Sequence, residues 1–157
     1  MSLFKILVLV TAVFTSTVFA NNLKLIEEGC NSNDGYSCYI LSTYYFLGTD
    51  VKQDYVKAYK YAEKGCNLGN IDGCSAIGVA LYRGLGVRQD FSKARYYCEK
   101  ACENGNAVSC FALGSMFVGG DGVRQDYSVG KEYFGKACDL GEQNGCDFFA
   151  RLNEDGY

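Results

Sequence analysis

Cysteine pairs at a fixed spacing constrain this chain more than any other feature. The 157-residue sequence contains nine cysteines, and eight of them form four pairs with seven residues between the two members. Successive pairs begin 36 residues apart. They are Cys30/Cys38, Cys66/Cys74, Cys102/Cys110 and Cys138/Cys146. A fixed period of about 20 to 50 residues is typical of repeat arrays, so the pairs predict a stack of similar units.

The sequence between the cysteines repeats as well. Aligned on the first cysteine of each pair, the segments GTDVKQDYVKA, GLGVRQDFSKA and GDGVRQDYSVG coincide without gaps. Because the same residue types return at the same places, the structure of one unit should recur along the chain. The expected units are about residues 30–65, 66–101, 102–137 and a truncated 138–157.

Each unit is predicted to form two helices. Apolar residues recur four positions apart in its first half, as Leu41 and Tyr45 do, which places them on one helix face. A Gly-rich stretch then ends this helix, and an aspartate follows that is well placed as the N-cap of the second helix. The first helices are expected at about 36–47, 72–83 and 108–119, with the second ones starting near Asp54, Asp90 and Asp126.

The spacing within a cysteine pair requires the chain to turn. In one unbroken helix the Cα atoms of Cys66 and Cys74 would lie about 12 Å apart, at about 1.5 Å per residue. A disulfide needs about 4.4–6.8 Å, and the intervening LGN offers a glycine C-cap followed by a polar helix start. Eight cysteines allow about 105 pairings, but the repeat selects the local one. Each bridge should join two successive helices and stabilise the fold by roughly 2.5 kcal/mol in the chain-entropy model.

The N-terminal 20 residues have the pattern of a secretory signal peptide. Lys5 precedes the apolar run ILVLVTAVF, and VFA fits a cleavage site after Ala20. The run is short for a bilayer span, and a retained signal anchor is the alternative. Nine cysteines behind such a segment indicate an oxidising compartment. We therefore expect residues 21–157 to be exported to an oxidising compartment, without a membrane association after cleavage.

Composition disfavours several classes of partner and site. Without Lys5 the chain carries 14 Lys and Arg against 18 Asp and Glu, a balance that disfavours nucleic acid and anionic membranes. It contains no histidine, the commonest general base and zinc ligand. Seven residues between paired cysteines also match structural zinc sites poorly. We expect no metal, no cofactor and a monomer.

The motif G-x-G-V-x-Q-D-Y-x-K-A, followed by a helix, K-A-C and G-C, resembles the Sel-one-like repeat (SLR), a relative of the tetratricopeptide repeat. The 36-residue unit with its cysteine pair is similar to the Helicobacter cysteine-rich proteins over about residues 22–157. The resemblance implies an all-α, disulfide-stapled α/α solenoid with a right-handed superhelix, in a bacterial protein that is secreted or periplasmic. Members of that family are described as penicillin-binding proteins or slow β-lactamases, and some as secreted factors in host interaction. It therefore implies, as one alternative for this chain, that it binds or slowly hydrolyses β-lactams.

The residues give that activity little support. A serine β-lactamase uses Ser-x-x-Lys with partner motifs, and the one match here is Ser128 to Lys131 in the expected second helix of the third unit. No Lys-Thr-Gly follows it. We interpret the match as accidental and situated on a solvated helix face. Ser128 and Lys131 are nevertheless the candidates if the protein is an enzyme, which the sequence leaves undecided.

Cys98 is the cysteine outside the four pairs. The aligned residues of the neighbouring units are Ala62 and Phe134, which indicates an interior position. Our interpretation is an inert buried thiol. The alternative is intermolecular pairing, or exchange with the Cys102–Cys110 bridge, and both would require access and a low thiol pKa.

Positions that differ between units indicate where the array meets something else. On the first helices they recur at i, i+4 and i+7 or i+8 and form one stripe. In solenoids of this type the first helices line a concave surface that binds extended partners. We therefore predict an interaction scaffold for a peptide, a protein or a cell-wall fragment. The alternative is that aromatic members such as Phe46 and Phe111 fill gaps between units. The predicted face comprises Tyr39, Thr43, Phe46, Ser75, Val79, Tyr82, Arg83, Phe111 and Ser115.

Overall fold

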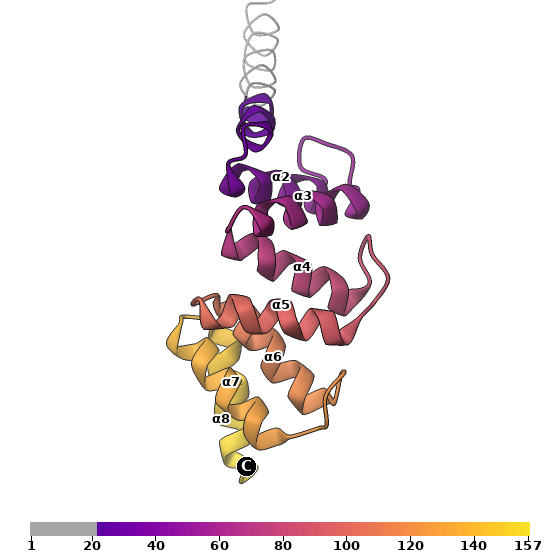
Figure 1. Ribbon diagram of the computed structural model, residues 1–157. Helices are drawn as coiled ribbons and strands as arrows, with labels where there is room; N and C mark the ends of the chain where they lie inside the picture. The colour runs from indigo at the N-terminus through magenta and orange to yellow at the C-terminus, as the bar shows by residue number, and fades with distance from the viewer. Residues whose placement is uncertain (1–21) are drawn as a thin grey trace, which may run out of the picture.

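The protein is a stack of short helices, seen in a computed structural model that describes residues 22–157. Residues 22–31 are helical, and no described residue forms a strand. The helices that follow are α2 (Gly35–Leu47), α3 (Tyr55–Asn67), α4 (Ile71–Arg83), α5 (Phe91–Glu103), α6 (Ala107–Gly119), α7 (Tyr127–Asp139) and α8 (Gln143–Glu154). Figure 1 shows them layered in chain order from the indigo end to the yellow end, which confirms the all-α solenoid. The expected signal peptide, residues 1–20, lies outside the described residues.

Side-chain caps set the helix boundaries. The carboxylates of Asp54, Asp90 and Asp126 accept hydrogen bonds from backbone N–H groups in the first turns of α3, α5 and α7, so the capping prediction is confirmed. The first helices α4 and α6 are capped in the same way by Asn70 and Asn106. Observed boundaries of the first helices lie within one residue of those predicted.

Disulfides join each helix hairpin to the next. Each cysteine is bonded to the other member of its pair, and the Cα–Cα distances are 4.5, 4.6, 4.8 and 4.6 Å in chain order. The bridges are Cys30–Cys38, Cys66–Cys74, Cys102–Cys110 and Cys138–Cys146. Between Cys66 and Cys74 the chain reverses at Gly69, whose φ of +89° suits a residue without a side chain. Each bridge therefore holds the last turn of one helix against the first turn of the next.

The first bridge joins the helix of residues 22–31 to α2. Cys38 lies in the first turns of α2, Cys30 lies near the end of the preceding helix, and both side chains are fully buried. Together with Leu41 they form a small core of their own, separate from the main buried cluster. The first bridge is thus part of the packing that attaches the N-terminal helix to the array.

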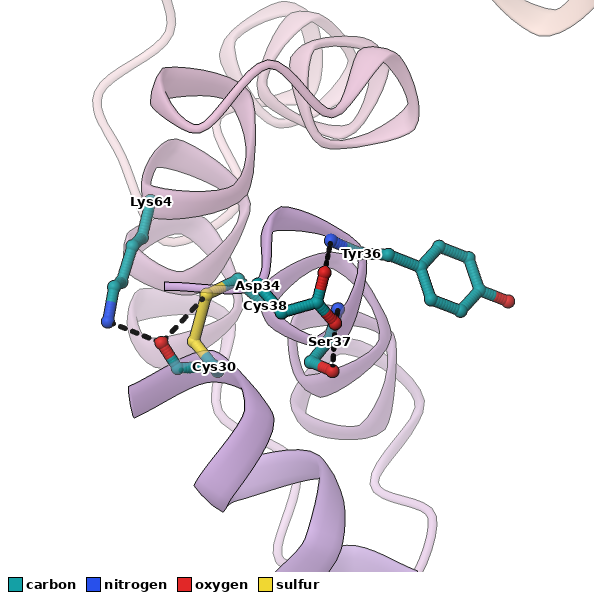
Figure 2. Close-up of a disulfide and its surroundings, with 6 residues drawn as sticks. All are labelled: Cys30, Asp34, Tyr36, Ser37, Cys38 and Lys64. Carbon is teal, nitrogen blue, oxygen red and sulfur yellow. Dashed lines mark hydrogen bonds between the residues drawn. A yellow bond between two sulfur atoms is a disulfide. The ribbon is translucent and has the colours of Figure 1, made fainter. Parts of the chain in front are cut away.

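Polar contacts support both sides of the bridge between Cys30 and Cys38. In Figure 2 the carboxylate of Asp34 accepts hydrogen bonds from backbone N–H groups at the start of α2. On the other side the Lys64 ammonium donates to the Cys30 carbonyl at 2.6 Å. That contact satisfies a carbonyl at the C-terminal end of a helix, where a cation also suits the dipole.

Within a unit, the two helices pack through residues of complementary size. A Cβ added to Gly78 in α4 would lie 2.6 Å from the Sγ of Cys98 in α5. A Cβ added to Gly114 in α6 would lie 2.6 Å from the ring of Phe134 in α7. In the first unit the corresponding positions hold Ser42 and Ala62. There the larger of the two residues is on the first helix, whereas in the other units it is on the second. The hairpin interface is thus filled by a different pair of residues in each unit.

Between units, a glycine in one unit packs against the second helix of the unit before it. Gly86 has φ of +70°, and a Cβ there would lie 2.7 Å from the Val56 nitrogen and closer still to the Tyr55 carbonyl. Gly122 approaches Phe91 in the same way. Asp50 occupies this position in the first unit, also with positive φ. Glycine is therefore required where a loop lies against the preceding unit.

First helices also contact one another along the stack. Helix α2 contacts α4, and α4 contacts α6, whereas α3 and α5 make at most a marginal contact. First helices thus lie closer together than second helices, which places them on the inner side of the curved stack. None of the helices in residues 22–157 has both the length and the apolar character needed to cross a membrane.

Candidate functional site

A groove with a volume of about 300 Å³ lies where the first two units meet. Its walls are mostly apolar, and they come from both helices of the first unit and from the first helix of the second. From α2 it takes Tyr39, Ser42, Thr43 and Phe46, and from α3 Tyr55, Ala58, Tyr59 and Ala62. From α4 it takes Asp72, Ser75, Ala76, Val79 and Ala80. Leu85, Asn106 and Val108 complete it, so the groove reaches the start of the third unit.

Aromatic side chains shape one wall of this groove. The ring of Phe46 meets that of Tyr55 edge-on, with centroids 5.5 Å apart. Tyr39 packs against Tyr36, which is 59% exposed beside the groove. Burial, and then the nearby charge of Asp72, raise the pKa of Tyr39, so its phenol is neutral and able to donate a hydrogen bond over the physiological range.

A chain of hydrogen bonds links α4 and α6 at the end of the groove. The side-chain amide of Asn106 donates to Oδ1 of Asp72 at 2.9 Å, and its oxygen accepts from the Ser75 hydroxyl at 3.0 Å. The Ser109 hydroxyl donates to the Ser75 hydroxyl at 2.7 Å, and all of Ser109 is buried. Because Asn106 also caps α6, this single side chain connects the helix start to the previous unit.

The predicted binding stripe divides into two parts in the structure. Its first part lines the groove and consists of Tyr39, Thr43, Phe46, Ser75 and Val79. Its second part, Tyr82, Arg83, Phe111 and Ser115, does not line the groove.

Members of the second part contact residues of their own or the following unit. The Tyr82 hydroxyl donates to Asp121 at 2.6 Å, a bond that, with burial, raises the pKa of Tyr82 to about 12. The ring of Phe111 packs on Phe134 and Phe148, with centroids 5.3 and 5.6 Å away. Phe111 therefore packs between helices, as in the alternative interpretation that it fills a gap between units.

The paired cysteines contribute to the groove only indirectly. Cys38 precedes the groove residue Tyr39 in α2, but its own side chain is buried in the bridge to Cys30 and does not line the groove. Cys74 has the same place before Ser75 in α4. The two bridges therefore hold the starts of α2 and α4, two of the helices that line the groove.

The predicted stripe contains five of the sixteen residues that line the groove, and sequence reasoning missed the other eleven. The second-helix tyrosines Tyr55 and Tyr59 were not in the predicted stripe, and neither were Asp72, Asn106 and Val108. One signal was available, because aligned positions 36, 72 and 108 hold tyrosine, aspartate and valine, an unusually dissimilar set. Tyr55 gave no such signal, since its column continues with Phe91 and Tyr127. The column of Tyr59 does vary, because the aligned residues are Arg95 and Lys131, but it lies on a second helix, outside the stripe considered.

The candidate catalytic pair lies elsewhere. Ser128 is exposed in the first turn of α7, and neither Ser128 nor Lys131 lines the groove. The Lys131 ammonium donates to Oδ1 of Asn153 at 3.1 Å and to the carbonyl of Tyr157. Within residues 22–157 no cluster of three or more acidic or cysteine side chains could hold a metal ion. A β-lactamase activity at these residues stays a prediction drawn from the resemblance alone.

Cys98 is fully buried beside Gly78. Burial, with a smaller contribution from the charge of Glu99, raises the pKa of the Cys98 thiol to about 12. The thiolate is the nucleophilic form, so at neutral pH this cysteine has neither the protonation state nor the access that exchange requires.

We expect native protein at pH 8 to leave Cys98 unmodified by iodoacetamide, and denaturant without reductant to expose one alkylatable thiol per chain. Mass spectrometry of the intact protein after quenching measures both. Rapid uptake of one label by the native protein would instead show an accessible thiol and would favour the exchange alternative.

Comparisons with known proteins give a consistent result. The family model described as Sel1 repeat matches residues 35–70, 71–106 and 107–142, in a register that begins at the first helix of each unit. No match is found among curated proteins.

Solved structures from three bacteria share the fold. Cysteine-rich protein B of Helicobacter pylori is 26% identical with a TM-score of 0.62, over 82% of this chain and 92% of its own. The Escherichia coli protein c5321, a protective antigen of uropathogenic strains with an SLR fold, is 22% identical with a TM-score of 0.78, and covers 86% of this chain. A Sel1 repeat protein from Oxalobacter formigenes is 22% identical with a TM-score of 0.77, over 82% of this chain. The matches span 29% of the Escherichia coli protein and 53% of the Oxalobacter protein.

Proposed function

This chain belongs to the Sel1 repeat family, whose arrays are protein-interaction scaffolds, and on that premise we propose that it binds an extended peptide segment of a partner protein in the groove formed by α2, α3 and α4. The groove is the single observation that carries the proposal. It lies on the inner side of the stack and crosses a unit boundary, as a site for an extended segment should.

The size and lining of the groove favour a peptide. Its volume of about 300 Å³ is at the lower end of the range for ligand pockets, about 300–1,000 Å³, and suits one or two side chains. Exposed apolar residues also lie at its margins, with Tyr36 beside the groove at 59% exposure and Val108 in its lining at 50%. A segment anchored in the groove would therefore find further apolar contacts along the inner helices. Rigid aromatic side chains such as Tyr39 and Phe46 provide contact area at low entropic cost.

We also propose that binding takes place outside the cytoplasm. Four disulfides join successive helices of this array, and structural disulfides persist in oxidising compartments such as the periplasm. The partner segment would then belong to an exported or cell-surface protein.

Substituting Val79 by glutamate should abolish peptide binding while lowering the melting temperature by only a few degrees, because Val79 is half-buried in the groove wall. The measurement is panning of a phage-displayed library of random dodecapeptides against the disulfide-bonded protein, followed by fluorescence titration of the selected peptides. Val56→Glu is the matched control, since Val56 is 51% exposed in α3 and does not line the groove.

Peptides retained by the wild type and by Val56→Glu but lost with Val79→Glu would support the proposal. Failure to select any peptide, or selected peptides that bind all three proteins equally, would overturn it. If Val79→Glu lowered the free energy of unfolding by as much as it weakened the free energy of binding, Val79 would be a core residue instead.

A further inference from the structure

We propose that the bound segment places a lysine or arginine side chain against the carboxylate of Asp72, an inference that rests on the proposed peptide-binding function. Asp72 lies in the first turn of α4, and it is the one charged side chain among the described residues that line the groove. No basic residue of the described chain lines the groove with it. The groove therefore has a fixed negative charge in an otherwise apolar and aromatic setting.

The chain itself leaves this carboxylate without a cation. The ion pairs among residues 22–157 are Lys24–Glu28, Lys93–Asp90 and Arg95–Glu99, and none involves Asp72. Oδ1 of Asp72 accepts the 2.9 Å hydrogen bond from Asn106, and no hydrogen bond to Oδ2 is found within the described residues. The dipole at the start of α4 makes this charge tolerable in the free protein.

Binding of a peptide changes the solvation of the Asp72 carboxylate. A segment that covers the groove removes water from Asp72, and an apolar or acidic side chain there would leave a desolvated carboxylate unpaired. A guanidinium or ammonium group would replace the lost water with charge-assisted hydrogen bonds. The charge thus selects against neutral and acidic residues at this position, in addition to favouring basic ones.

The neighbouring aromatic rings also suit a cation. Tyr39 lies close enough to Asp72 for that charge to raise its pKa, and Tyr59 lines the same groove. Faces of tyrosine rings attract ammonium and guanidinium groups, and the stem of a long basic side chain packs on apolar walls. The corresponding positions in the neighbouring units are Tyr36 and Val108, so the preference for a cation should be confined to one position flanked by apolar ones.

The same charge can be removed without disturbing the groove. In Asp72→Asn the side-chain oxygen can still accept the hydrogen bond from Asn106, so the link between α4 and α6 is retained. Asp139→Asn is the matched control, because Asp139 is exposed at the end of α7 and does not line the groove.

The test uses the dodecapeptides selected by the wild-type protein. We expect a lysine or arginine at one fixed position beside apolar residues, and a preference that disappears when the same library is panned against Asp72→Asn but persists with Asp139→Asn. For one selected peptide made synthetically, replacing that arginine by the neutral analogue citrulline should weaken binding to the wild type by about fivefold or more. The same replacement should have little effect on binding to Asp72→Asn.

Two results would overturn the inference, and they are distinguishable from each other. Groove-binding peptides with no basic preference, or with one that Asp72→Asn leaves unchanged, would overturn the pairing of a basic side chain with Asp72. The proposed peptide-binding function would be unaffected. Failure to select peptides that depend on Val79 would overturn both the peptide-binding function and the pairing with Asp72.

Discussion

Reduction of the four disulfides is expected to unfold the array at 37 °C. Each bridge closes a nine-residue loop, worth roughly 2.5 kcal/mol in the chain-entropy model, and four of them sum to roughly 10 kcal/mol. That sum is comparable with the net stability of about 5–15 kcal/mol that a whole domain has. Each helix from α2 to α8 is only 12 or 13 residues long and contacts helices of its own and the adjoining units alone, so little of its stability is intrinsic.

Circular dichroism at 222 nm, recorded against temperature with and without a phosphine reductant, measures this effect. Single-bridge variants give an internal comparison. Replacing Cys102 and Cys110 by alanine should cost about 2–4 kcal/mol, because both residues lie in the main buried cluster. Replacing Cys138 and Cys146 should cost less, since both are partly exposed near the end of the array. Reduced protein that kept a cooperative melt within a few degrees of the oxidised form would contradict this account.

Gly86→Ala is expected to be the most damaging single methyl addition in the chain. Alanine must adopt a φ of +70°, and its Cβ would overlap the Tyr55 carbonyl and lie 2.7 Å from the Val56 nitrogen. Both neighbours are backbone and cannot rotate away. We expect a loss of about 3–5 kcal/mol, or a fall in Tm of roughly 10 °C or more.

Gly69→Ala separates the two causes of that loss. Gly69 also has positive φ, at +89°, but a Cβ there meets nothing within 4 Å. Its cost should be about 1 kcal/mol, which is the conformational penalty alone. Equal losses for the two variants in thermal or denaturant unfolding would show that the contact between the units is not tight.

Period and spacing were enough to predict the helices. The first helices were expected from apolar residues four positions apart, and they form within one residue of the expected ends, because each is bounded by a capping side chain and a glycine. Within the cysteine pairs, chain length alone requires a reversal, so the turn at Gly69 could be anticipated. Features that belong to one unit are thus visible in one unit's sequence.

The groove could be predicted only in part, because it is made between units. Tyr59 of α3 and Val79 of α4 line it together, although they stand in different columns of the repeat and belong to different units. The hydrogen bond from Asn106 to Asp72 spans 34 residues, and no periodic pattern marks it. Dissimilarity between aligned residues could not distinguish Val79, which lines the groove, from Phe111, which packs on Phe134.

The complementary pairs inside each hairpin restrict how such genes can recombine. Gly78 faces Cys98 and Gly114 faces Phe134, and each pair belongs to the two helices on either side of one Gly-rich loop. A crossover in the disulfide turn exchanges whole hairpins and keeps every pair together. A crossover in the Gly-rich loop could join the helix of Ser42 to the helix of Phe134, where the ring has no space. Viable chimaeras should therefore have their junctions between the paired cysteines.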